Sequence, residues 1–132
     1  MIITPLYMLT DEAEEIQSFS EITTGDNPVE IKNRIVDLSV YVARTGKMLA
    51  DAKFHLNQKK SQETMKVIED ILLGAKLSAK VQNSLIDSIC KEEQYLVDWI
   101  ERLNRTCTHQ LDAMRSVLSY ERETARLNNT GY

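Results

Sequence analysis

Apolar residues recur every three or four positions across residues 28–60, and this repeat limits the possible folds more than any other feature. The steps alternate between four and three, the spacing of a helix that keeps one side against a partner helix. The repeat consists of Ile31, Ile35, Leu38, Val42, Thr45, Leu49, Ala52 and Leu56. Asn27 before Pro28 is a typical N-cap followed by proline at the first helical position, so we expect a long helix over 28–60.

A second apolar stripe runs beside the first on the same predicted helix. It consists of Val36, Val40, Ala43, Gly46, Ala50 and Phe54. Its small residues would let another backbone approach closely, and such packing would explain a glycine inside a helix, where it costs about 1 kcal/mol. Two stripes predict two neighbouring helices. The sequence therefore predicts a helical bundle and not an isolated coiled-coil pair.

Three further segments are predicted to be helical. In the acidic segment 1–27, Thr10 resembles an N-cap with Asp11 and Glu12 in the first turn, so a helix is expected from Thr10 to about Ile22. A turn at 59–61 is expected to precede a short helix over 61–74, ended by Gly74.

The last segment, 78–127, is expected to be a long helix that is either broken near Lys91 or continuous. Its apolar repeat is Leu96, Ile100, Leu103, Cys107, Leu111, Met114 and Leu118. No stretch alternates with period two, so no sheet is expected. The prediction is a single all-α domain over 1–132, a helical bundle built on two long antiparallel helices.

Charge is unevenly distributed along the chain. Residues 1–30 carry seven acids and no Lys or Arg, whereas residues 31–60 carry seven bases and two acids. The acidic segment could fold back on the basic helix, or it could mimic nucleic acid at a partner's surface. The simpler interpretation is that the acids favour a helix N-terminus and keep the protein in solution.

Several classes of protein are disfavoured by what the sequence lacks. It contains no run of about 18 apolar residues, and its start lacks the positive region of a signal peptide. Two distant cysteines, Cys90 and Cys107, suit a reducing cytoplasm. Nucleophile-elbow, phosphate-loop, HExxH and CxxC motifs are all missing, so we expect no enzyme, no cofactor and no membrane span.

Each histidine has a carboxylate at helical distance, which is the spacing that a metal site in a helical bundle would use. Asp51 precedes His55 by four residues, and Asp112 follows His109 by three. Both histidines lie away from the apolar stripes of their helices. We therefore expect exposed polar residues and no metal ligands.

Aromatic and basic residues on the last predicted helix form the most informative polar cluster. Its members are Tyr95, Trp99, Arg102, His109 and Tyr120. Aromatic residues beside Arg are typical of protein interfaces and of single-strand nucleic-acid sites, although they can also pack within the domain. The basic residues that could join a nucleic-acid surface are Lys32, Arg34, Arg44, Lys47, Lys53, Lys59 and Lys60.

Residues 43–53 (ARTGKMLADAK) and 103–106 (LNRT) resemble small helical proteins of unknown function encoded by bacteriophages and prophages. The resemblance implies a cytoplasmic accessory protein of phage DNA metabolism or particle assembly, and it supplies no site residues. The leading hypothesis is a non-enzymatic interaction protein that contacts both itself and a protein partner. We expect it to be a homo-oligomer, and a dimer is the first expectation. The alternative is a nucleic-acid-binding accessory protein of phage replication or recombination.

Overall fold

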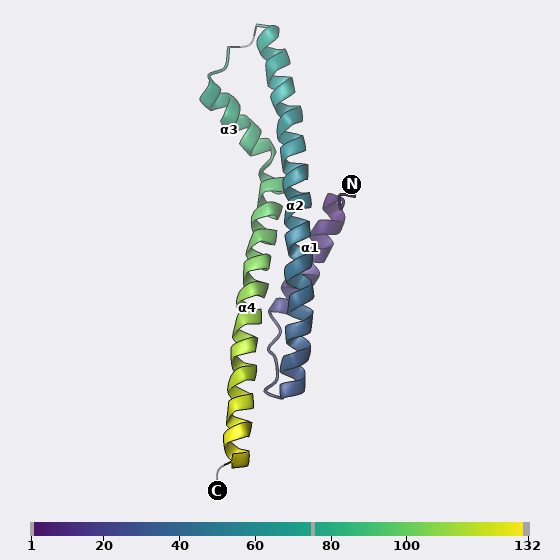
Figure 1. Ribbon diagram of the computed structural model, residues 1–132. Helices are drawn as coiled ribbons and strands as arrows, with labels where there is room; N and C mark the ends of the chain where they lie inside the picture. Colours follow the sequence, from purple (N-terminus) through teal and green to yellow (C-terminus); the bar gives the residue numbers. More distant parts are fainter. Residues whose placement is uncertain (1, 75, 131–132) are drawn as a thin grey trace.

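The computed structural model describes residues 2–74 and 76–130, and these residues form four α-helices without a strand. The helices are α1 (Leu6–Ser20), α2 (Pro28–Leu72), α3 (Ala79–Ile89) and α4 (Lys91–Thr130). Figure 1 shows α2 and α4 as two long rods side by side, with α1 against their middle part and α3 at one end. The prediction of an all-α bundle built on two long helices is confirmed.

The two long helices run antiparallel. Lys59 of α2 bonds Glu93 near the start of α4, whereas Arg34 bonds Gln110 much farther along α4. Both predicted core repeats lie at this interface: Leu38 and Thr45 of α2 and Ile100 of α4 are fully buried. The periodicity therefore identified the faces that pair.

Helix α2 begins as predicted, because the Asn27 side chain accepts a hydrogen bond of 2.8 Å from the backbone N–H of Val29. Gly74 was predicted to end a separate short helix over 61–74; it instead follows the end of α2 at Leu72, and its φ of 100° disfavours other residues. The turn expected at 59–61 was wrong: α2 continues unbroken to Leu72. No Gly or Pro interrupts this stretch, so the helix can continue. Lys59 also pairs with Glu93, which holds this part of α2 against α4.

The alternatives left open for 78–127 resolve as a break at Cys90. Ser78 caps α3 through a bond of 3.3 Å from the N–H of Val81, and α4 starts at Lys91. Cys90 itself is buried, and its N–H still bonds the carbonyl of Ile86 at 3.0 Å. The kink makes α3 lean away from the axis of α4, as Figure 1 shows.

Helix α1 starts one turn earlier than predicted. Pro5 takes the N-cap position, so Thr10 lies inside the helix and its hydroxyl donates to the carbonyl of Leu6 at 3.1 Å. The first turn consequently carries no acid. The apolar side of α1 consists of Leu9, Ala13 and Ile16, which are buried against α2 and α4.

The second stripe of α2 was expected to pack against another helix, and this expectation was wrong. Val36 is 55% exposed and Val40 60% exposed, and Ala43, Gly46 and Ala50 are exposed as well. A Cβ built at Gly46 would meet no heavy atom of the described chain within 4 Å. Because α1 and α4 occupy neighbouring sides of α2, this third side lacks a partner within residues 2–74 and 76–130.

Within the described ranges, no helix has both the length and the apolar character that crossing a bilayer requires.

Candidate functional site

Trp99 and Tyr95 lie at the junction of α1 and α4, one helical turn apart. The Trp99 side chain is half-buried, and its indole N–H donates a hydrogen bond of 3.0 Å to Oε1 of Gln17 on α1. Tyr95 is 67% exposed, and its ring centroid is 6.2 Å from that of Trp99. Trp99 therefore helps to hold α1, while Tyr95 is available to another molecule.

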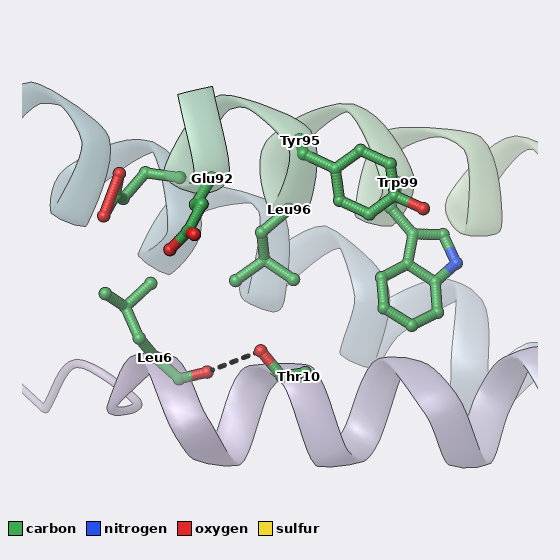
Figure 2. A pocket seen from close by; sticks show the side chains of 7 residues that line it. Leu6, Thr10, Glu92, Tyr95, Leu96 and Trp99 are labelled. Atoms are coloured by element: carbon green, nitrogen blue, oxygen red, sulfur yellow. Dashed lines mark hydrogen bonds between the residues drawn. The ribbon is translucent and has the colours of Figure 1, made fainter. Parts of the chain in front are cut away.

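These two aromatic residues border a small cleft between α1 and the first turns of α4 (Figure 2). The cleft has a volume of about 200 Å³. Its lining residues are Leu6, Thr10, Glu92, Glu93, Tyr95, Leu96 and Trp99. Ligand sites for drug-sized molecules usually measure about 300–1,000 Å³, so this cleft is suited to a single side chain.

One end of the cleft is acidic, but one of its two carboxylates is already bound within the fold. Glu93 is nearly buried, and both of its oxygens accept from Lys59 Nζ, at 2.8 and 3.1 Å. The hydrogen bond with Glu93 raises the pKa of Lys59, so the Lys59 ammonium stays charged at neutral pH. Glu92 is exposed at the N-terminus of α4, where the helix dipole favours a negative charge.

The remaining members of the predicted cluster do not line this cleft. Tyr95, Arg102 and His109 are seven residues apart, which places them along one exposed side of α4. Arg102 lies in a surface patch that contains both acidic and basic side chains, together with Asp98, Glu101 and Arg105. Tyr120 is 70% exposed, beyond the part of α4 that α1 covers. The structure thus brings Tyr95 and Trp99 together and leaves Arg102 and His109 at a distance from them along the helix.

Arg44 was a candidate surface residue, and it forms an intramolecular ion pair. Its guanidinium makes two hydrogen bonds with Glu12 of α1, at 2.6 and 2.7 Å, and a third with the Thr4 hydroxyl at 3.2 Å. The hydrogen bonds with Glu12 raise the pKa of Arg44. Through this ion pair the acidic segment folds back on the basic helix, as one of the sequence interpretations anticipated.

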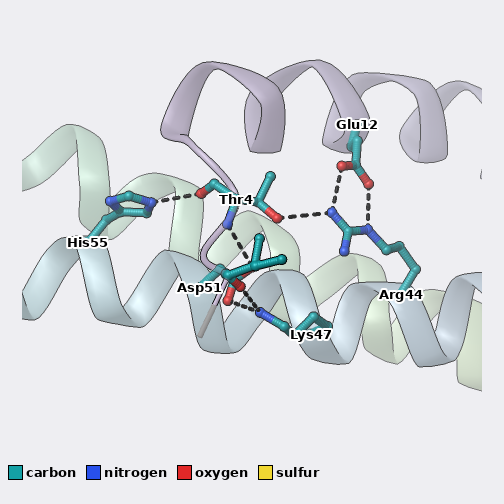
Figure 3. Close-up of polar contacts among 7 residues, drawn as sticks. Thr4, Glu12, Arg44, Lys47, Asp51 and His55 are labelled. Carbon is teal, nitrogen blue, oxygen red and sulfur yellow. Dashed lines mark hydrogen bonds and ion pairs between the residues drawn. The ribbon is translucent and has the colours of Figure 1, made fainter.

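Lys47 and Asp51 join Arg44 in holding the N-terminal residues, as Figure 3 shows. Asp51 is 3% exposed; its carboxylate accepts from Lys47 and, at 3.1 Å, from the backbone N–H of Thr4. Burial alone would raise the pKa of Asp51, but the hydrogen bonds from Lys47 and Thr4 together hold it below its ordinary value. Lys47 also donates to the carbonyl of Ile2 at 3.1 Å. Lys53, the third basic candidate on α2, is exposed.

His55 was expected to be exposed, and it is half-buried instead. Its Nε2 donates a hydrogen bond of 2.7 Å to the carbonyl of Thr4, in the same cluster as Asp51. His109 is exposed, as expected. Among the described residues, no three His, Cys, Asp or Glu side chains come close enough to hold a metal ion.

Sequence reasoning missed the anchoring role of Asp51 and Thr4. Arg44, Lys47, Asp51 and His55 follow one another at helical spacing, and this polar stripe was the available signal. It could not show that a short N-terminal segment supplies the opposing groups. Within the described chain, every fully buried side-chain nitrogen and oxygen has a hydrogen-bond partner.

Comparisons with known proteins give no functional guide. No family model matches the chain, and no significant match was found among curated proteins or among solved structures.

Proposed function

We propose that the protein is a non-enzymatic helical interaction protein that assembles with itself and with a protein partner. The supporting observation is an exposed apolar face on α2, which we name the outer stripe. The outer stripe consists of Val36, Val40, Ala43, Ala50, Phe54, Met65, Ile68 and Leu72. The outer stripe has two mainly apolar segments, 36–54 and 65–72, separated by exposed polar residues. Monomeric proteins rarely expose large apolar surface, because covering it is favourable by about 25 cal/mol per Å².

The partner contact is proposed for the cleft beside Tyr95. Tyr and Trp are enriched among the residues that dominate binding energy at protein interfaces. Tyr95 is largely exposed, while Trp99 is held in place by Gln17, so the second ring offers a rigid wall. A partner would insert one apolar side chain between these rings and Leu6.

We also propose a cytoplasmic setting. Cys90 and Cys107 are both free and buried, which is compatible with a reducing compartment. In the context that the phage resemblance implies, such a protein would act as an accessory factor of particle assembly or DNA metabolism.

Self-assembly is tested by light scattering coupled to gel filtration at micromolar concentration. The expected result is a dimer of this 15.1 kDa chain. A monomer at every concentration tested would contradict the proposal. Chemical cross-linking in solution would give an independent estimate of the same stoichiometry.

The partner contact is tested with two matched tyrosine variants, both on α4. Tyr95→Ala should abolish capture of the partner from cells that express the chain, because it removes one wall of the cleft. Tyr120→Ala replaces an equally exposed tyrosine away from the cleft and should leave capture unchanged. Equal capture by both variants would contradict the cleft beside Tyr95 as the partner contact.

Nucleic-acid binding is the competing function, and the ion pairs of α2 weigh against it. Arg44, Lys47 and Lys59 each pair with a carboxylate, while Arg34 is buried over the Phe19 ring at 3.9 Å. These four therefore offer little positive charge to a phosphate backbone. Fluorescence anisotropy with a labelled ~30-nucleotide strand and its duplex, from about 50 to about 200 mM salt, tests this alternative. Binding that weakens steeply with salt would favour it over the protein-assembly function.

A further inference from the structure

We propose that two copies of the chain pair through the outer stripe of α2, in antiparallel orientation, about a twofold axis that passes beside Phe54. This inference rests on the proposed self-assembly and specifies its geometry.

The apolar residues of the outer stripe are arranged symmetrically about Phe54. A twofold interface requires that when one residue meets a second, the second also meets the first on the other copy. Apolar residues lie 18, 14 and 11 positions before Phe54 and again 11, 14 and 18 positions after it. The mirrored pairs are Val36 with Leu72, Val40 with Ile68, and Ala43 with Met65. A second α2 turned end for end therefore pairs apolar residues with apolar residues near both ends of the stripe and at Phe54.

The sizes of the mirrored residues are also compatible with close packing. Ala43 opposes the long side chain of Met65, so a small residue receives a large one. At the axis, the two Phe54 rings meet as an aromatic pair, and each is 40% exposed in the single chain. Between these contacts Lys47 falls opposite Ser61 and Ala50 opposite Gln58, so polar side chains occupy the two stretches that flank the axis.

Charge selects the antiparallel orientation over the parallel one. A parallel pair in register would place the two Lys47 side chains together at the interface. Like charges at short distance are unfavourable in a partly desolvated interface. The antiparallel arrangement places each Lys47 opposite Ser61 instead.

The size of the face is sufficient for a specific dimer. Residues 36–72 of a helix span about 55 Å, and a helix face about 10 Å wide then covers about 550 Å² per copy. Two copies bury about 1,100 Å², which exceeds the roughly 1,000 Å² expected of a biological interface. A face of this length also needs a partner helix as long as α2 itself, which a second copy provides.

The orientation is tested by disulfide cross-linking between single-cysteine additions on the outer stripe. Ala43→Cys and Met65→Cys should cross-link when the two variants are mixed under mild oxidation, and neither should cross-link efficiently alone. One of the two carries a size tag, so that the mixed dimer is recognised by mass. Ala113→Cys, at an exposed alanine on α4, is the matched control and should remain uncross-linked. Cross-linking of Ala43→Cys with itself would overturn the antiparallel orientation.

The surface is tested by charge insertion. Ala43→Glu should raise the dimer dissociation constant at least about tenfold, because it buries a carboxylate against Met65. Ala113→Glu should leave the dissociation constant unchanged, and circular dichroism of both variants verifies that the helices are intact. A dimer that tolerates Ala43→Glu and fails to cross-link overturns the α2 interface while self-assembly itself stands. A wild-type monomer instead contradicts self-assembly, and the α2 pairing with it.

Discussion

The Asn104 side-chain amide of α4 donates a hydrogen bond of 2.9 Å to the hydroxyl oxygen of Thr45 on α2, inside the interface of the two long helices. The same amide donates to the carbonyl of Val42 at 3.0 Å, and the Thr45 hydroxyl donates to the carbonyl of Tyr41 at 2.6 Å. Apolar stripes can slide past each other by one turn at little cost, whereas this polar pair forms in one register only.

Asn104→Leu should therefore lower the free energy of unfolding by about 1–3 kcal/mol, because it leaves the buried Thr45 oxygen with one partner fewer. Urea unfolding of this variant, of Thr45→Val and of the double variant would give the coupling between the two residues. Asn57→Ala, at an exposed position on α2, serves as the control. Additive effects of the two single substitutions would contradict a shared role.

Gly46→Ala should stabilise the protein by about 0.5–1 kcal/mol, because alanine has the higher helix propensity and the added Cβ meets open space. Gly74→Ala should have the opposite effect, since its φ of 100° is strained for alanine. Thermal unfolding at low protein concentration measures both. A destabilising alanine at position 46 would mean that another chain already approaches this side of α2.

Asp51 should make stability depend on pH on the acid side. Its pKa is held below the unfolded value, so its contribution is present at neutral pH and is lost as the pH falls below about 4 and through the folded pKa. Asp51→Asn should cost about 1–3 kcal/mol at pH 7, and the difference from wild type should shrink in acid. Urea unfolding at neutral and acid pH tests this, with Asp112→Asn, at an exposed aspartate, as the control.

Both thiols should be unreactive in the folded protein. Cys107 is fully buried, and burial raises its pKa, an effect that Arg34 opposes only in part. A thiol reagent should modify Cys90 and Cys107 about a hundredfold or more slowly than in the unfolded chain. Ala113→Cys supplies an exposed thiol for comparison, and equal rates at all three positions would contradict the burial of the two native cysteines.

Local signals in the sequence predicted most of the helical architecture. The caps at Asn27 and Gly74 and the repeat that contains Leu38 depend on neighbours within a few residues, so they can be recognised without the fold. Local sequence signals predicted less of the candidate site. Trp99 and Tyr95 belong to the predicted cluster of five residues on α4, but the cleft beside them exists only because α1 lies across α4.

The apolar periodicity by itself determined that this chain is helical, that α2 carries two stripes apolar enough to pair, and which face of α4 is apolar. Only the tertiary structure decided which stripe of α2 is buried, because the two stripes resemble each other and α4 can cover one side. It also decided that Asp51 is buried and that α2 passes through 59–61 without a turn. Both outcomes depend on groups distant in the sequence, Thr4 for Asp51 and Glu93 for Lys59, whose positions no local pattern encodes.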